Sequence, residues 1–148
     1  MRTIPLIAAQ LLWLAAPFAA AQDAAEGPPR TQSPPGAEVY IQSPADGARV
    51  SSPFVVRFGL RGMGVAPAGV TTPNTGHHHL LIDVETLPPD NQPLPATEQI
   101  VHFGRGQTET ELDLPPGTHT LQLALGDALH IPHDPPVRSA RITITVTE

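Results

Sequence analysis

The chain of 148 residues has no cysteine and no lysine, and aromatic residues make up only 4% of it. Without cysteine it cannot form disulfides, thiolate metal sites or a cysteine nucleophile. Without lysine it cannot use a Schiff base, and no serine lies in a nucleophile-elbow motif. Metal-ligating chemistry in this chain must therefore come from other side chains, among which the seven histidines stand out.

Basic residues are also scarce. Eight arginines face 14 acidic residues, which gives a formal net charge of −6 at pH 7. The arginines are scattered along the chain, whereas a nucleic-acid-binding protein needs a basic face. The same scatter disfavours binding to anionic membrane surfaces. We therefore predict no nucleic-acid partner.

The N-terminus has the pattern of a secretory signal peptide over residues 1–21. Arg2 supplies the positive start, an apolar stretch runs from Ile4 to Phe18, and small alanines precede a cut ahead of Gln22. The stretch is short for a membrane span, which needs roughly 20 apolar residues, and an uncleaved anchor is the alternative. We expect export to the periplasm or the extracellular space, with no transmembrane segment after signal cleavage.

The remaining chain divides into a tether and one domain. Proline and glycine dominate residues 22–37, which predicts a flexible tether that cannot bury an apolar face. Residues 38–148 are enough for a single domain with its own core. The chain holds 19 prolines and shows no helical periodicity of useful length. We therefore expect an all-β domain.

Alternating apolar and polar residues predict short strands along this domain. The expected strands cover residues 38–43, 53–61, 77–84, 107–113, 118–126 and 139–147. Six to seven strands in a domain of this size favour an antiparallel β-sandwich of immunoglobulin-like type, with a barrel or jelly roll as the alternative. Residues 85–99 form a long proline-rich loop, of a length that is often functional.

The histidines gather at two places in this predicted fold. His77, His78 and His79 open the strand 77–84, where alternation turns His78 toward the core and the other two to the opposite face. His130 and His133 lie in the loop before the last strand, which meets the start of strand 77–84 at one end of the sandwich. We therefore predict a metal site made by His77, His79, His130 and His133, suited to zinc or copper.

Several further residues are candidates for supporting roles. Met63, His78 and His102 are additional candidate ligands. Three carboxylates are expected to accept hydrogen bonds from the ligand rings: Asp83, Asp127 and Asp134. His119 follows a Pro-Pro-Gly turn, where immunoglobulin-like sandwiches often place a tyrosine that closes a corner, and we expect it to substitute for that tyrosine.

Four sequence blocks occur in order along the domain. They are GHHHLLID at 76–83, HFGRGQTE at 102–109, LPPGTHTLQL at 114–123, and Gly126–Asp127 followed by HIPHDPP at 130–136. Together they resemble a family of exported bacterial domains of unknown function, the domain of unknown function 4399. The resemblance covers about residues 40–146 and implies no particular chemistry.

Two functions remain in view. The first is an exported, histidine-rich β-sandwich module that binds zinc or copper through the histidine cluster. The alternative is a structural or recognition domain of the cell envelope, whose histidines brace loops by hydrogen bonds and whose partner is an envelope protein or a small ligand. An enzyme is less favoured, because hydrolysis here would need a metal to activate water.

Overall fold

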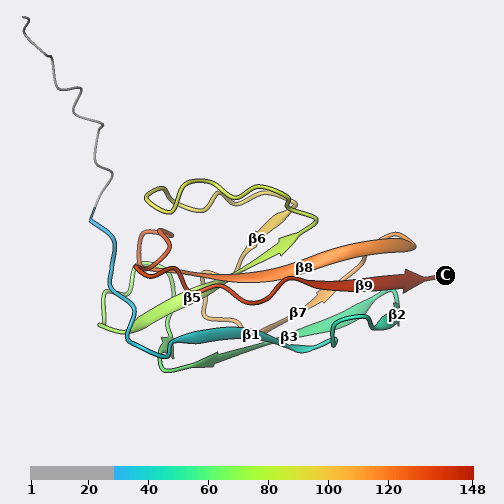
Figure 1. Ribbon diagram of the computed structural model, residues 1–148, viewed down its shortest axis with the longest axis horizontal. Coiled ribbons are helices and arrows are strands. Elements are labelled where there is room, and N and C mark those ends of the chain that lie inside the picture. Colours follow the sequence, from blue (N-terminus) through green and yellow to red (C-terminus); the bar gives the residue numbers. More distant parts are fainter. Residues whose placement is uncertain (1–28) are drawn as a thin grey trace, which may run out of the picture.

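The computed structural model describes residues 29–148 and is all β in that part of the chain, with nine strands in two sheets and no helix (Figure 1). The expected signal peptide and residues 22–28 of the expected tether lie outside the described residues. The prediction of an all-β domain is therefore confirmed for these residues.

The smaller sheet has three antiparallel strands in the order β1-β3-β7 and is curled. Its strands are β1 (Glu38–Ser43), β3 (Phe54–Arg61) and β7 (Glu109–Leu112). The alternation seen in the sequence of β3 has its expected effect, since Phe54, Val56 and Phe58 are buried and the intervening Val55 and Arg57 are exposed.

The larger sheet has the strand order β2-β9-β8-β5-β4, and β6 pairs with β5. Its strands are β2 (Arg49–Ser51), β4 (Gly64–Val65), β5 (Thr75–Ile82), β6 (Ile100–His102), β8 (Gly117–Gly126) and β9 (Ile142–Thr147). All six predicted strands are present; the strand predicted at 38–43 matches β1 at both ends, and the other five have shifted ends. The three shortest strands, β2, β4 and β6, were not expected from the sequence, because two or three residues carry no readable alternation.

The core lies between the two sheets. Leu80 and Ile82 of β5 pack there with the buried side chains of β3 and β8. His78 belongs to this layer, because it is fully buried and its ring centre lies 5.2 Å from that of Phe58. Met63 is partly buried and also packs against this core.

A second layer covers the outer face of the larger sheet. Residues 83–99 run above β5, β6 and β8 as a long loop (Figure 1). Leu94 of this loop packs with Leu81, Ile100 and Ala124 in a second apolar cluster, and its amide donates a hydrogen bond of 2.8 Å to the carbonyl of His130. The outward-facing side chains of β5 are therefore buried, although they point away from the main core.

The segment just before β1 is fastened to the loop that follows β8. Thr31 donates a hydrogen bond of 2.8 Å to Asp127, and Arg30 donates one of 3.1 Å to the carbonyl of Pro132. The amide of Ser33 donates to the carbonyl of Asp134 at 3.0 Å. Residues 30–33, which we expected to belong to a flexible tether, are thus held against the domain by hydrogen bonds.

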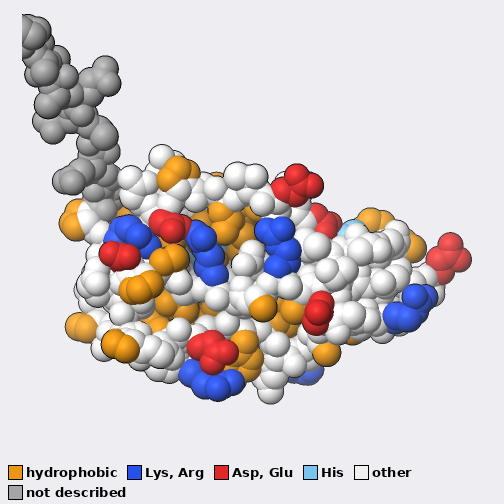
Figure 2. Space-filling model, in the orientation of Figure 1, with side chains coloured by type: hydrophobic (Ala, Val, Ile, Leu, Met, Phe, Trp, Pro, Cys, Tyr) orange, Lys and Arg blue, Asp and Glu red, His pale blue; other side chains and the backbone are white. Residues whose placement is uncertain are grey.

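On the face that Figure 2 shows, arginines and acidic residues are interspersed, and no large patch of one charge is present. Within residues 29–148, no helix is long and apolar enough to cross a membrane.

Candidate metal centre

Four histidine rings converge on the outer face of the larger sheet. They are His77 and His79 of β5, His102 of β6 and His130 of the loop after β8. The six distances between their ring centres are 4.9 Å (77–79), 4.9 Å (77–102), 5.0 Å (77–130), 5.1 Å (79–102), 6.0 Å (79–130) and 4.6 Å (102–130). We call these four residues the histidine cluster.

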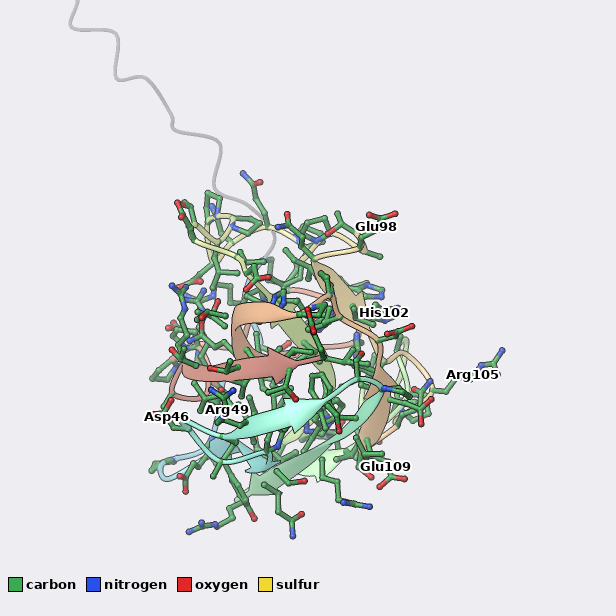
Figure 3. All side chains as sticks on the ribbon, turned by 90° about the vertical axis from the view of Figure 1, so that its right-hand side faces the viewer. Asp46, Arg49, Glu98, His102, Arg105 and Glu109 are labelled. Carbon is green, nitrogen blue, oxygen red and sulfur yellow. The ribbon has the colours of Figure 1, made fainter. Side chains whose placement is uncertain are left out.

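Strand pairing and one turn position the four rings. His77 and His79 are two residues apart, so alternation places both on one face of β5. His102 is the direct partner of His79 in the antiparallel β5–β6 pair. His130 has a left-handed backbone with φ of 69°, and its amide donates a hydrogen bond of 2.9 Å to the carbonyl of Asp127. Figure 3 shows His102 near the edge of the domain, between the labelled Glu98 and Arg105.

Two glycines make room for the rings. Gly126 pairs with His77 across β5 and β8, and a Cβ at Gly126 would lie 2.8 Å from Cε1 of His79 and 3.2 Å from Cα of His130. A Cβ at Gly104 would overlap the ring of His102. Larger residues at either position would therefore push the rings apart.

Five ring nitrogens of the cluster are buried without a hydrogen-bond partner among residues 29–148. Both ring nitrogens of His77 and of His79 are buried and unpaired, as is Nε2 of His102. One nitrogen from each of these three rings lies within 4.8 Å of the others. A buried polar group without a partner costs about 1–3 kcal/mol, so this arrangement is expensive unless something binds there.

Burial keeps these rings uncharged at neutral pH. Burial first, and then the neighbouring His130 and His102, lower the pKa of His77 to about 4, although Asp127 opposes them. Burial and the adjacent rings lower the pKa of His79 to about 3. The pKa of His102 is also lowered, first by burial and then by His130. Neutral imidazole is the form that ligates a metal, so these rings need not lose a proton to bind one.

The fourth predicted ligand, His133, lies elsewhere. It is fully buried, and its Nε2 lies 3.2 Å from the carbonyl of Thr75, to which it donates. Its ring approaches Gly76, on the side of β5 that faces Leu125 and the main core. The structure thus brings together three of the four predicted ligands. His102 takes the place that we expected His133 to hold.

The three predicted supporting carboxylates hold other groups. Asp127 accepts hydrogen bonds from the amides of Leu129 at 2.9 Å and Ile131 at 3.0 Å, and so shapes the loop that carries His130. Asp134 pairs with Arg30 at 3.4 Å. Among the described residues, neither accepts a hydrogen bond from a ring of the cluster.

Asp83 and His119 form a separate bridge at the far end of β5. Nδ1 of His119 lies 2.7 Å from a carboxylate oxygen of Asp83, and Nε2 lies 2.9 Å from the carbonyl of Pro115. The second contact reaches back four residues, as the tyrosine of an immunoglobulin corner does. His119 therefore closes this corner, and Asp83 serves it, not the cluster.

The comparisons with known proteins confirm the family resemblance. A family model described as Domain of unknown function (DUF4399) matches residues 56–147, a span that contains all four rings of the cluster. No curated protein and no solved structure matches the chain. Because the family model covers more than half of the sequence, the chain belongs to the DUF4399 family of domains of unknown function.

Proposed function

We propose that this domain binds one transition-metal ion, zinc or copper, through His77, His79, His102 and His130. The observation that carries the proposal is the set of buried ring nitrogens that converge without a protein partner. A metal ion would use one nitrogen of each ring and so offset much of the cost of burying them. An all-imidazole set suits zinc or copper better than magnesium or calcium, which prefer oxygen ligands.

The alternative, loop bracing by hydrogen-bonded histidines, fits the cluster poorly. Bracing requires that each ring donate to or accept from a neighbouring loop, and the nitrogens of His77 and His79 do neither among the described residues. Other residues brace the loops instead. Asp127 shapes the loop after β8, and His119 closes the turn before β8.

Export and the finer fold belong to the same proposal. The N-terminal pattern supports export through a cleavable signal peptide to the periplasm or beyond. The strand orders β1-β3-β7 and β9-β8-β5-β6 correspond to A-B-E and G-F-C-C′ of a variable-type immunoglobulin domain, which supports an immunoglobulin-like sandwich. The cluster then lies on the outer face of the G-F-C sheet, and an envelope protein or another carrier of the ion is the expected partner.

Calorimetric titration of the untagged chain lacking residues 1–21 tests this function. We expect one zinc or copper ion per chain and a rise in melting temperature when the metal is added. The half-buried His102 and His130 are the variants of choice, because His102→Ala and His130→Ala remove ligands with little loss of core packing. His119→Gln is the matched control and should bind as the wild type does. Absence of heat with both metals at neutral pH would overturn the proposal.

A further inference from the structure

The four ring centres of the cluster form a tetrahedron. In a square of four points, both diagonals are about 1.4 times as long as the sides. Here the longest distance, 6.0 Å, joins His79 and His130, but the other pair that would have to be a diagonal, His77 and His102, is only 4.9 Å apart. The remaining four distances lie between 4.6 and 5.1 Å. A planar arrangement cannot give this set.

The size of the tetrahedron also fits a metal. Zinc–imidazole bonds of about 2.0–2.1 Å put each ring centre about 3.2 Å from the ion, and four such rings in a tetrahedron have centres about 5.2 Å apart. The observed separations of 4.6–6.0 Å bracket this value. The backbone therefore already holds the ring centres near the required spacing. One nitrogen from each of His77, His79 and His102 lies within 4.8 Å of the others, and the ring of His130 would have to turn a nitrogen toward them.

Resting on the proposed function, we infer that the cluster is a closed, tetrahedral four-imidazole zinc site with no coordination position for water or a substrate. Four protein ligands complete a tetrahedral zinc site, whereas catalytic zinc keeps one position open. The geometry is less suited to Cu²⁺, which prefers square-planar or tetragonal surroundings. His130 takes the position that a reactive water would occupy in a hydrolase.

The surroundings of the cluster support a closed site. The rings of His77 and His79 are 0% exposed, and the loop of residues 83–99 lies over this face of the sheet with Leu94 bonded to the backbone of His130. A bound ion would join three segments that are distant in sequence, namely β5, β6 and the loop after β8. The site would thus serve to hold these three segments together or to store the ion, not to catalyse a reaction.

Cobalt substitution tests the inference, because tetrahedral Co²⁺ absorbs visible light far more strongly than octahedral Co²⁺. We expect the wild-type chain with Co²⁺ to show intense visible bands that zinc abolishes by displacement. Added azide, which binds at an open position, should leave these bands unchanged in the wild type and shift them in His130→Ala. His102→Ala should respond to azide in the same way as His130→Ala.

The outcomes separate the two proposals. Weak, octahedral-type bands, or azide-sensitive bands in the wild type, would overturn the closed tetrahedral site while leaving metal binding intact. If neither Co²⁺ nor zinc binds by absorption or by calorimetry, the proposed function fails and the inference fails with it.

Discussion

His79 and His102 face each other directly across the antiparallel β5–β6 pair, with ring centres 5.1 Å apart. The next residue, Phe103, fixes this register, because it is buried, packs on Phe58 at 4.9 Å and donates its amide to the carbonyl of His78 at 3.0 Å. The position of His102 is therefore set by the buried Phe103 that follows it and by its cross-strand partner His79. It is not a free surface histidine.

This register predicts that His102, not His133, is needed for metal binding. Replacing His102 by alanine removes one of four ligands, and we expect zinc affinity to fall by more than about 100-fold. His133→Gln retains a side-chain donor toward the carbonyl of Thr75 and should leave affinity within about threefold. Calorimetric titration of both variants measures the difference. Equal losses in the two variants, or a larger loss in His133→Gln, would show that the ligand set is wrong.

A second prediction concerns the space beside the rings. A Cβ at Gly126 would lie 2.8 Å from Cε1 of His79, so Gly126→Ala should displace the ring and weaken zinc binding at least about tenfold. Overpacking there should also cost about 1–3 kcal/mol of the free energy of unfolding. Gly64→Ala is the matched control, because a Cβ at Gly64 would meet its nearest neighbour at an ordinary 3.4 Å. Metal titration and chemical denaturation follow both effects, and an alanine at 126 that binds zinc normally would contradict the geometry.

The sequence was sufficient for one half of the cluster and not for the other. The His-x-His spacing on a strand places His77 and His79 together by alternation alone, and the same rule sends His78 into the core. The sequence gives no position for His102, because β6 has only three residues and its pairing with β5 depends on the buried Phe103 and on the loop of residues 83–99. The run Ile100-Val-His-Phe103 was the available sequence signal for a short strand, since the apolar Val101 and Phe103 flank the histidine.

The choice between His130 and His133 also needed tertiary information. Both lie in the same loop, and the spacing His-x-x-His suggests that they act together. The left-handed backbone of His130 and the hydrogen bonds of Asp127 turn the two rings to opposite sides of β5. No pattern in the local sequence specifies this turn.

A third prediction is that His78, the middle residue of the three consecutive histidines, is not a metal ligand. His78 packs against Phe58 within the main core, and burial lowers its pKa to about 4. His78→Leu has a similar volume and should change the free energy of unfolding by less than about 1.5 kcal/mol. Zinc affinity should stay within about threefold of the wild type. Loss of zinc binding by a folded His78→Leu protein, as judged by circular dichroism, would return His78 to the ligand set.

A fourth prediction concerns pH and the bridge between His119 and Asp83. The hydrogen bond that His119 donates to Asp83 raises the pKa of His119 above 6.5. Burial raises the pKa of Asp83, but the hydrogen bonds from His119 and Thr120 outweigh it and hold that pKa below 3.8. The stability that the protonated His119 adds to the folded state is therefore fully present below pH 6.5 and is lost as pH rises through its raised pKa. The stability that the ionised Asp83 adds is fully present above pH 3.8 and is lost as pH falls through its lowered pKa.

Denaturation of wild type and His119→Gln at two pH values measures this bridge. We expect the free energy of unfolding of the wild type to exceed that of the variant by more at about pH 5.5 than at about pH 8, because only the protonated ring carries the charge. Since Asp83 is partly exposed, the change with pH should be less than about 1 kcal/mol. A stability difference that grows toward pH 8 would contradict the bridge.

The most direct test of the account is a crystal structure of the zinc-loaded domain with anomalous data collected at the zinc edge. We predict one strong peak per chain, about 2.0–2.1 Å from one nitrogen of each of His77, His79, His102 and His130, with no water on the ion. A peak that involves His133 or His119 in place of these rings, or no peak from crystals grown with excess zinc, would contradict it.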